Sequence, residues 1–212
     1  MTGSSLQRLD EHSLAAACEK LAAVDPVLSA LLDKNGTPPL WQRDANLRSL
    51  VYIVIEQKIS LSSAKAVMRR VDTLCPVWSA DALLAVSAEE LRAAGLSTSK
   101  VAYCHGIAQA VNKGSLNFEQ LNALPDNDVM SALLKIRGIG PWTAGVYLVM
   151  ALGRPDIWPS GDRALAVGVQ EAWQLTEVPD YPALDKLAIA WQPWRAVAAR
   201  IIWHAYLSQR TR

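Results

Sequence analysis

The sequence predicts an all-α protein, and three observations support this fold class. Alanine and leucine dominate the 212 residues, and apolar residues recur at spacings of three and four, the period of an amphipathic helix. β-Branched residues do not gather into alternating runs, so the strand period is missing. The chain is 51% hydrophobic and 19% charged, which provides enough apolar material for a buried core. We therefore expect a single helical unit.

Helical segments follow from this periodicity and from the residues that interrupt it. The expected helices cover residues 13–23, 26–32, 45–56, 62–75, 81–86, 88–94, 99–113, 118–121, 126–136, 141–152, 162–172, 181–189 and 194–208. Glycine, proline and polar clusters separate them, at KNGTPP (34–39), LCP (74–76), KGS (113–115) and GRPDIWPSGD (153–162). The last cluster is a long loop between two apolar helices, and such loops often carry functional residues.

Composition excludes several classes of protein. The formal net charge is +1 and is spread evenly along the chain, so any binding to nucleic acid must use main-chain groups and a few placed cations. Cys18, Cys75 and Cys104 show no CxxC spacing, which argues against a disulfide framework, a zinc site or an iron-sulfur cluster. The sequence has no export signal and no apolar run of membrane-spanning length. We expect a cytoplasmic protein.

The stretch IRGIGPWTA (136–144) predicts two helices joined by a very short turn. Gly138 and Gly140 allow positive φ angles and a close main-chain approach, while Pro141 suits the first turn of the second helix. A turn that ends in a helix N-terminus presents unpaired amides and a positive dipole to a phosphate. An ordinary αα-hairpin would use the same residue types, so this motif alone leaves both interpretations open.

This stretch, with Asp162 following in WPSGDRAL, resembles the helix-hairpin-helix element of the DNA glycosylase superfamily. Four further stretches agree with it: DPVLSALLDKNGTPPLWQR (25–43), VIEQKISLSSAKAV (54–67), LRAAGLSTSKV (91–101) and WQPWRAVAARIIWHAY (191–206). The last of them resembles the alkylation-repair branch, typified by 3-methyladenine DNA glycosylase II. The resemblance implies a two-lobed helical fold with a cleft between the lobes. Lobe one would cover about 1–42 plus 143–212, and lobe two about 43–142, ending in the hairpin.

The resemblance makes Asp162 the catalytic carboxylate, facing the cleft. Breaking an N-glycosidic bond builds positive charge on the sugar, and a fixed carboxylate stabilises that charge and orients or deprotonates the attacking water. The structural alternative for Asp162 is an N-cap of the helix that follows, and the two roles are compatible. Bifunctional relatives carry a lysine at the position of Trp142. We therefore expect a monofunctional enzyme without lyase activity.

A flipped, cationic base is attracted to aromatic faces, and the chain has eight tryptophans against one phenylalanine. Trp142 and Trp203 match pocket positions of the family, and Trp158 is a weaker candidate. A place in the core is the alternative for each of them.

The resemblance also implies how DNA is held. The expected DNA-binding residues are Gly138, Gly140 and Trp142 through their amides, Gln57 and Lys58 as candidates to fill the space left in the duplex, and Arg163 as a phosphate contact. A helix end for Gln57, a solvated cation for Lys58 and a surface position for Arg163 are the structural alternatives. Relatives commonly hold a monovalent cation, sodium or potassium, on main-chain carbonyls that correspond to Leu134, Ile136 and Ile139. We expect no other cofactor.

The function that this resemblance implies is removal of alkylated purines, 3-methyladenine and 7-methylguanine, from duplex DNA in base-excision repair. The expected partner is double-stranded DNA with damaged bases, bound by a monomer that associates with the nucleoid. One alternative is a glycosylase for another lesion, uracil or a mismatched base. A second is a non-catalytic helix-hairpin-helix protein that binds DNA.

Overall fold

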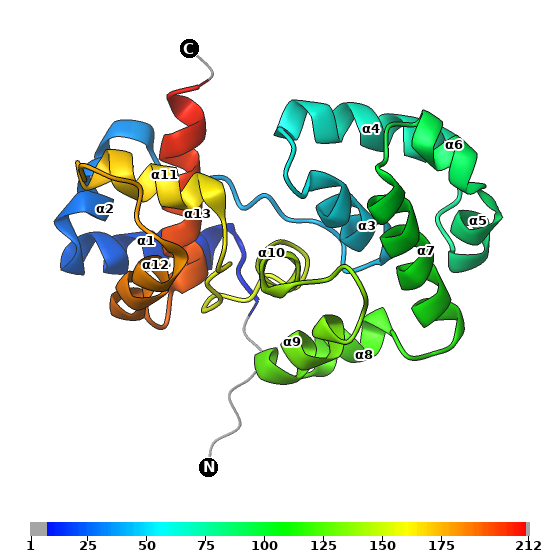
Figure 1. The fold of residues 1–212 in the computed structure, drawn as a ribbon. Coiled ribbons are helices and arrows are strands. Elements are labelled where there is room, and N and C mark those ends of the chain that lie inside the picture. The colour runs from blue at the N-terminus through cyan, green and yellow to red at the C-terminus, as the bar shows by residue number, and fades with distance from the viewer. Residues whose placement is uncertain (1–7, 211–212) are drawn as a thin grey trace. The chain divides into compact units, whose positions relative to one another are not determined.

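The computed structural model describes residues 8–210, and the regular elements in this range are all helices, which confirms the predicted fold class (Figure 1). The helices are α1 (Glu11–Val24), α2 (Pro26–Asn35), α3 (Leu47–Glu56), α4 (Leu61–Leu74), α5 (Ala80–Ala85), α6 (Ala88–Ala93), α7 (Thr98–Asn112), α8 (Phe118–Ala123), α9 (Asp126–Leu134), α10 (Pro141–Met150), α11 (Arg163–Ala172), α12 (Tyr181–Ala188), the short 3₁₀ helix η1 (Ile189–Trp191) and α13 (Arg195–Ser208).

The chain forms two compact units. One contains the residues up to Gln42 together with those from Leu148 onward, and the other contains Arg43–Tyr147. The first unit therefore holds α1, α2, α11, α12 and α13, and the second holds α3 to α9. Helix α10 begins in the second unit, and its last residues belong to the first.

Helix α13 is the central element of the first unit. Nine of its fourteen residues are buried, and it packs against α1, α2 and α11 (Figure 1). Apolar side chains from all four helices share one core cluster. The approach of α11 is close, because a Cβ atom on Gly168 would lie only 2.6 Å from Cγ2 of Ile202. Glycine at this position therefore allows α11 to rest directly on α13.

A fully buried arginine connects three segments of the first unit. From α13, the Arg200 guanidinium donates to the carbonyls of Leu40 (3.1 Å) and Val149 (2.7 Å), and to Ala196 in its own helix (3.1 Å). Burial lowers the pKa of Arg200 to about 10, so the group stays charged at neutral pH. A buried charge is costly unless hydrogen bonds compensate it, and the carbonyls supply them. These bonds fix the end of α10 and the segment after α2.

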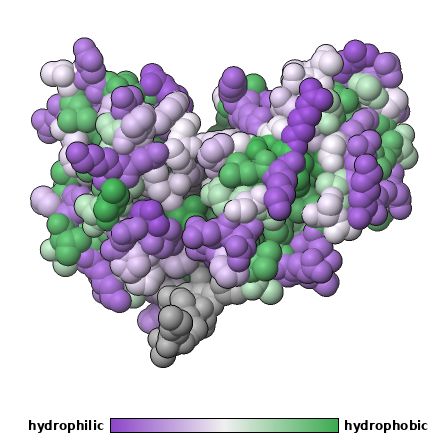
Figure 2. Space-filling model, turned by 60° about the horizontal axis from the view of Figure 1, so that its bottom comes forward, coloured by the Kyte–Doolittle hydropathy of each residue, from purple (hydrophilic) through white to green (hydrophobic). Residues whose placement is uncertain are grey.

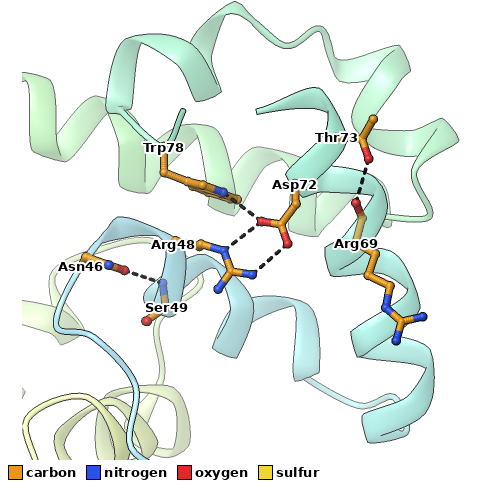
Figure 3. A network of polar contacts seen from close by, with 7 residues as sticks. All are labelled: Asn46, Arg48, Ser49, Arg69, Asp72, Thr73 and Trp78. Atoms are coloured by element: carbon orange, nitrogen blue, oxygen red, sulfur yellow. Dashed lines mark hydrogen bonds and ion pairs between the residues drawn. The ribbon is translucent and has the colours of Figure 1, made fainter. Parts of the chain in front are cut away.

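Helices α3 and α7 form the centre of the second unit. Helix α3 has seven buried residues out of ten and packs against α4 and α7, while α7 also contacts α5 and α6. Figure 3 shows the polar network that fastens α4 to α3. In this network Arg48 donates two hydrogen bonds of 2.8 Å to Asp72, whose carboxylate also accepts the Trp78 indole N–H at 2.9 Å.

Side-chain caps explain why many of the helices begin where they do. In these helices an oxygen of the N-cap side chain accepts an amide N–H from the first turn, which satisfies a donor that the helix itself cannot. The capping residues are Asp10, Asp25, Asn46, Ser60, Ser79, Ser87, Ser97, Asn117, Asp162 and Asp180.

The surface mixes polar and apolar side chains. On the face drawn in Figure 2, hydrophilic and hydrophobic side chains are interspersed. Such a mixture is usual for folded proteins, so hydropathy alone does not mark a binding site here. Within the described residues, no helix combines the length and apolar character needed to cross a membrane.

Candidate active site

The hairpin between α9 and α10 has the geometry that its glycines predict, with one difference. Gly138 has φ +90°, a conformation that favours glycine, and a Cβ atom there would lie 2.1 Å from the ring of Tyr103 on α7. Gly140, where glycine would also allow a positive φ, does not have one. Instead, the space where its Cβ would stand is open, with no atom within 4 Å. Gly138 therefore shapes the turn, and Gly140 leaves the main chain accessible.

Helix α10 starts directly after this turn. The Gly140 carbonyl accepts the amide of Ala144 at 3.0 Å, so the first helical turn begins at Pro141 as predicted. Trp142 is half-buried in that first turn, whereas Thr143 is buried with 2% of its surface exposed. The amides at this end of α10 are the ones that a helix leaves without intrahelical partners.

The hairpin is joined to the turn between α3 and α4. The Gln57 carboxamide donates to the Gly138 carbonyl at 3.0 Å and to Thr143 Oγ1 at 2.9 Å. The next residue, Lys58, is exposed and has φ +58°, a left-handed conformation that is uncommon for a residue other than glycine. Gln57 therefore faces the hairpin, and Lys58 stands at the tip of the turn.

Asp162 is the N-cap of α11 and is buried, with 9% of its surface exposed. Its Oδ1 accepts the amide of Leu165 at 2.8 Å and the indole N–H of Trp203 at 3.2 Å. The Trp203 bond crosses from α13 to the start of α11. The two helices are close enough for this bond because Gly168 has no side chain to collide with Ile202. The cap and the indole together fix the orientation of the carboxylate.

The loop that carries Asp162 is anchored within the first unit at several points. Arg195 donates to both carboxylate oxygens of Asp156, at 2.9 and 3.1 Å, and to its main-chain carbonyl. Ser160 Oγ donates to Asp185 at 2.8 Å, and the Leu9 amide donates to the Gly153 carbonyl at 2.8 Å. The loop is long, but these bonds hold it in place close to α11 and α13.

The other predicted residues of the first unit have different surroundings. Trp158 is half-buried and its ring lies 5.5 Å from that of Trp191, which in turn lies 5.7 Å from the ring of Trp173. Trp158 is thus one end of a row of three tilted tryptophans, in which Trp191 belongs to the core cluster and the other two pack against it. Arg163, the first residue of α11, is exposed.

The carbonyls expected to hold a cation lie where α9 ends and the turn begins. The Ile136 carbonyl accepts the amide of Ile139 at 3.0 Å, and Leu134 is exposed. A carbonyl oxygen has two lone pairs, so the Ile136 oxygen has capacity for a cation beside this amide. Within the described residues, no group of three or more His, Cys, Asp or Glu side chains is arranged to bind a metal ion.

The structure brings two sets of predicted residues together. In the first unit Asp162 contacts Trp203, and in the second unit Gln57 contacts the Gly138 turn. Trp142 belongs to the second unit and Asp162 to the first. Sequence reasoning missed both contacts, because they join residues 41 and 81 positions apart and no local pattern encodes them.

Residues 51–193 match the family model of the HhH-GPD superfamily base excision DNA repair proteins. This match covers the turn at Gln57, the hairpin and Asp162. The chain belongs to this superfamily.

Several known proteins are similar to this one over most of the chain. The putative DNA-3-methyladenine glycosylase YfjP of Bacillus subtilis is 26% identical over 84% of this chain, which spans 65% of that relative. The alkylbase DNA glycosidase-like protein mag2 of Schizosaccharomyces pombe is 26% identical, with 94% of this chain and 93% of mag2 covered. The S. pombe 3-methyladenine DNA glycosylase Mag1, solved in complex with abasic DNA, has a TM-score of 0.84 at 22% identity and covers 92% of this chain and 97% of its own.

Proposed function

We propose that this superfamily member is a monofunctional DNA glycosylase that hydrolyses the N-glycosidic bond of alkylated purines in duplex DNA. The leading substrates are 3-methyladenine and 7-methylguanine, and the product is an abasic site. The single observation that carries the proposal is the buried Asp162 carboxylate, whose Oδ1 is held by the Leu165 amide and the Trp203 indole. The names of the curated relatives support the substrate class.

The chemistry requires a negative charge at a fixed place. As the bond to the base breaks, the sugar gains positive charge, and a preorganised carboxylate stabilises it without having to reorient. Asp162 would also orient or deprotonate the water that attacks the sugar carbon. An alkylated purine is already cationic and leaves readily, so this reaction needs no strong general acid.

Tryptophan side chains are proposed to select the alkylated base. The nucleotide must leave the base stack for its glycosidic bond to be reached, and a cationic base then favours aromatic walls. Trp142, half-buried at the start of α10, and Trp203 are each proposed to offer an aromatic face to such a base. Trp203 then has two roles, since its N–H also orients Asp162. Trp158 is a weaker candidate because its ring packs against that of Trp191.

DNA is held mainly through main-chain groups. The amides of Gly138, Gly140 and Trp142 would bind a phosphate, supplemented by a sodium or potassium ion on the carbonyls of Leu134, Ile136 and Ile139. Lys58, exposed at the tip of its turn, is the proposed residue that fills the duplex, and Arg163 is a proposed phosphate contact. Gln57 supports the turn from the hairpin side.

The residues around the hairpin support the proposed absence of lyase activity. A lyase needs an amine that forms a Schiff base with the sugar. From Gly138 to Asp162 the sequence contains no lysine, and Trp142 occupies the position where bifunctional relatives carry one.

The test is release of free bases from methylated duplex DNA, separated by chromatography, with strand nicking scored before and after alkali. We expect 3-methyladenine and 7-methylguanine in the released fraction and nicks only after alkali. Nicking before alkali would disprove the monofunctional assignment. If the protein binds duplex DNA but releases no methylated base, the substrate assignment is wrong. The alternatives are then a uracil or mismatch substrate, or a non-catalytic binding role.

A further inference from the structure

A lysine of another helix, α7, is hydrogen-bonded to the turn between α3 and α4. Lys100, in the first turn of α7, points its ammonium at the C-terminus of α3 and donates to the carbonyls of Ile55 and Gln57, both at 2.7 Å. These carbonyls are among the acceptors that a helix end leaves without partners. Helix α3 has no basic residue in its own last turn, so the cation that complements its dipole comes from α7.

Lys100 is placed at some energetic cost. Its side chain is partly buried, and burial lowers the pKa of its ammonium. Among the described residues, no carboxylate lies within ion-pair distance of it, and both of its hydrogen bonds go to main-chain carbonyls. Burying part of an ammonium without a counter-ion costs free energy, and an apolar side chain in the same place would not have this cost. The two hydrogen bonds to the carbonyls of Ile55 and Gln57 offset it.

The same turn is bonded to the hairpin from its other side. The main-chain carbonyl of Gln57 accepts from Lys100, while its side chain donates to the Gly138 carbonyl and to Thr143. Tyr103, one helical turn after Lys100 on α7, packs its ring on Gly138. Helix α7 therefore supports the turn through Lys100 and the hairpin through Tyr103, and Gln57 links the two.

We propose that Lys100 is a positioning residue, which holds the carbonyls of Ile55 and Gln57 and so fixes the turn bearing Lys58 against the hairpin. The turn and the hairpin then form one preformed surface for damaged duplex DNA. This inference rests on the proposed function. It assigns Lys100 no contact with DNA. The turn enters the duplex only where a base has left the stack, so its orientation matters for abasic or damaged DNA and little for intact DNA.

The experiment compares binding to two duplexes of the same sequence, one with a tetrahydrofuran abasic analogue and one intact, by fluorescence anisotropy. Loss of a charge-assisted hydrogen-bond pair in Lys100→Met is expected to weaken abasic-duplex binding about tenfold and intact-duplex binding less than about twofold. Lys100→Arg, which retains donors for both carbonyls, should recover binding to within about threefold of wild type. The matched control is Lys113→Met, which removes an exposed charge from the end of the same helix and should change neither affinity.

Equal weakening for both duplexes, or no change for either, would overturn the inference. Where Lys100→Met does not fold, Thr143→Val serves instead, because it removes the buried oxygen that Gln57 bonds and keeps the side-chain shape. A selective loss for the abasic duplex of about threefold supports the inference, and an unchanged ratio of affinities refutes it.

Wild-type base release is measured in the same series. Release of methylated bases, combined with an unchanged affinity ratio in Lys100→Met, refutes only the role of Lys100. A wild type that neither releases bases nor prefers the abasic duplex refutes the proposed function and this inference together.

Discussion

At the scale of single residues, Asp162 combines two roles that the sequence left as alternatives. Its Oδ1 caps α11 through the Leu165 amide and also accepts the Trp203 indole N–H. The cap holds the carboxylate at a helix N-terminus, where a negative charge is stabilised by the dipole. The structural role therefore helps to place the group proposed to act on the sugar.

The Trp203 hydrogen bond gives a direct prediction. Trp203→Phe keeps an aromatic ring but removes the N–H, so Asp162 loses a hydrogen bond that helps to orient its carboxylate. We expect the single-turnover rate of base release to fall about tenfold, since a hydrogen bond to a charged group contributes about 1.5 kcal/mol or more. Trp173→Phe, which changes the ring that packs against Trp191 and leaves the bonds of Asp162 in place, is the control and should leave that rate unchanged.

Much of this site could be anticipated from local sequence, but its contacts could not. IRGIGPWTA identified the hairpin because glycine and proline constrain the backbone locally, and Asp162 was recognised at the start of its helix. Glycine allows a positive φ at both Gly138 and Gly140, but the turn has this conformation only at Gly138. The hydrogen bond from Trp203 depends on the packing of α11 on α13. The local sequence around either residue does not predict this packing.

At the scale of elements, the two hairpin glycines have separable roles. Gly138→Ala must accept a positive φ and a contact with the Tyr103 ring, whereas Gly140→Ala meets open space. We expect Gly138→Ala to lower the free energy of unfolding by about 2 kcal/mol, measured by chemical denaturation. Gly140→Ala should change it by less than about 0.5 kcal/mol.

The effect of Gly140→Ala should show in DNA binding instead. The added methyl group stands where the main chain is accessible, so affinity for duplex DNA should fall several-fold without a loss of stability. Similar stability losses for both variants would contradict this division of roles.

The pairing of α3 with α4 predicts a dependence of stability on pH. The Arg48 hydrogen bonds, and then that of Trp78, hold the pKa of Asp72 below its usual range (Figure 3). A lowered folded-state pKa means that the ionised form stabilises the fold above the unfolded-state pKa and that this contribution is lost as pH falls through the folded-state pKa. The sensitive window is therefore below about pH 4.

We expect Asp72→Asn to lower the free energy of unfolding by about 0.5 to 1 kcal/mol at pH 7, a small value because the pair is partly exposed to solvent. The difference from wild type should shrink as the pH is lowered below 4 in urea titrations. Asp33→Asn, at an exposed position of α2, is the control. A difference that grows at low pH would contradict the assignment.

At the scale of the whole molecule, the proposed activity draws on both units. The hairpin, Trp142 and Lys58 belong to the second unit, and Asp162 with Trp203 belongs to the first. Helix α10 is continuous from one unit into the other. The sequence predicted an all-helical chain of this family, because helical periodicity and helix breaks are local, whereas the pairing of helices within each unit emerges only from packing.

Net charge at this scale predicts how DNA binding responds to salt. The chain carries a formal charge of +1, and the exposed cations beside the hairpin and at the proposed phosphate contact are Lys135, Arg137 and Arg163. If about three phosphates are neutralised, the logarithm of the binding constant should fall with the logarithm of salt concentration with a slope of about −3. A slope steeper than about −6 would contradict DNA binding mainly through main-chain groups.

The central claim is that Asp162 is the catalytic carboxylate, and Asp162→Asn tests it most directly. Asparagine caps a helix as well as aspartate does, so α11 should persist while the charge is lost. We predict that single-turnover release of methylated purines falls by about a hundredfold or more, with abasic-duplex affinity within a few-fold of wild type. Asp180→Asn, which changes the exposed cap of α12, should leave the rate unchanged. An Asp162→Asn enzyme that releases bases at the wild-type rate would contradict the account.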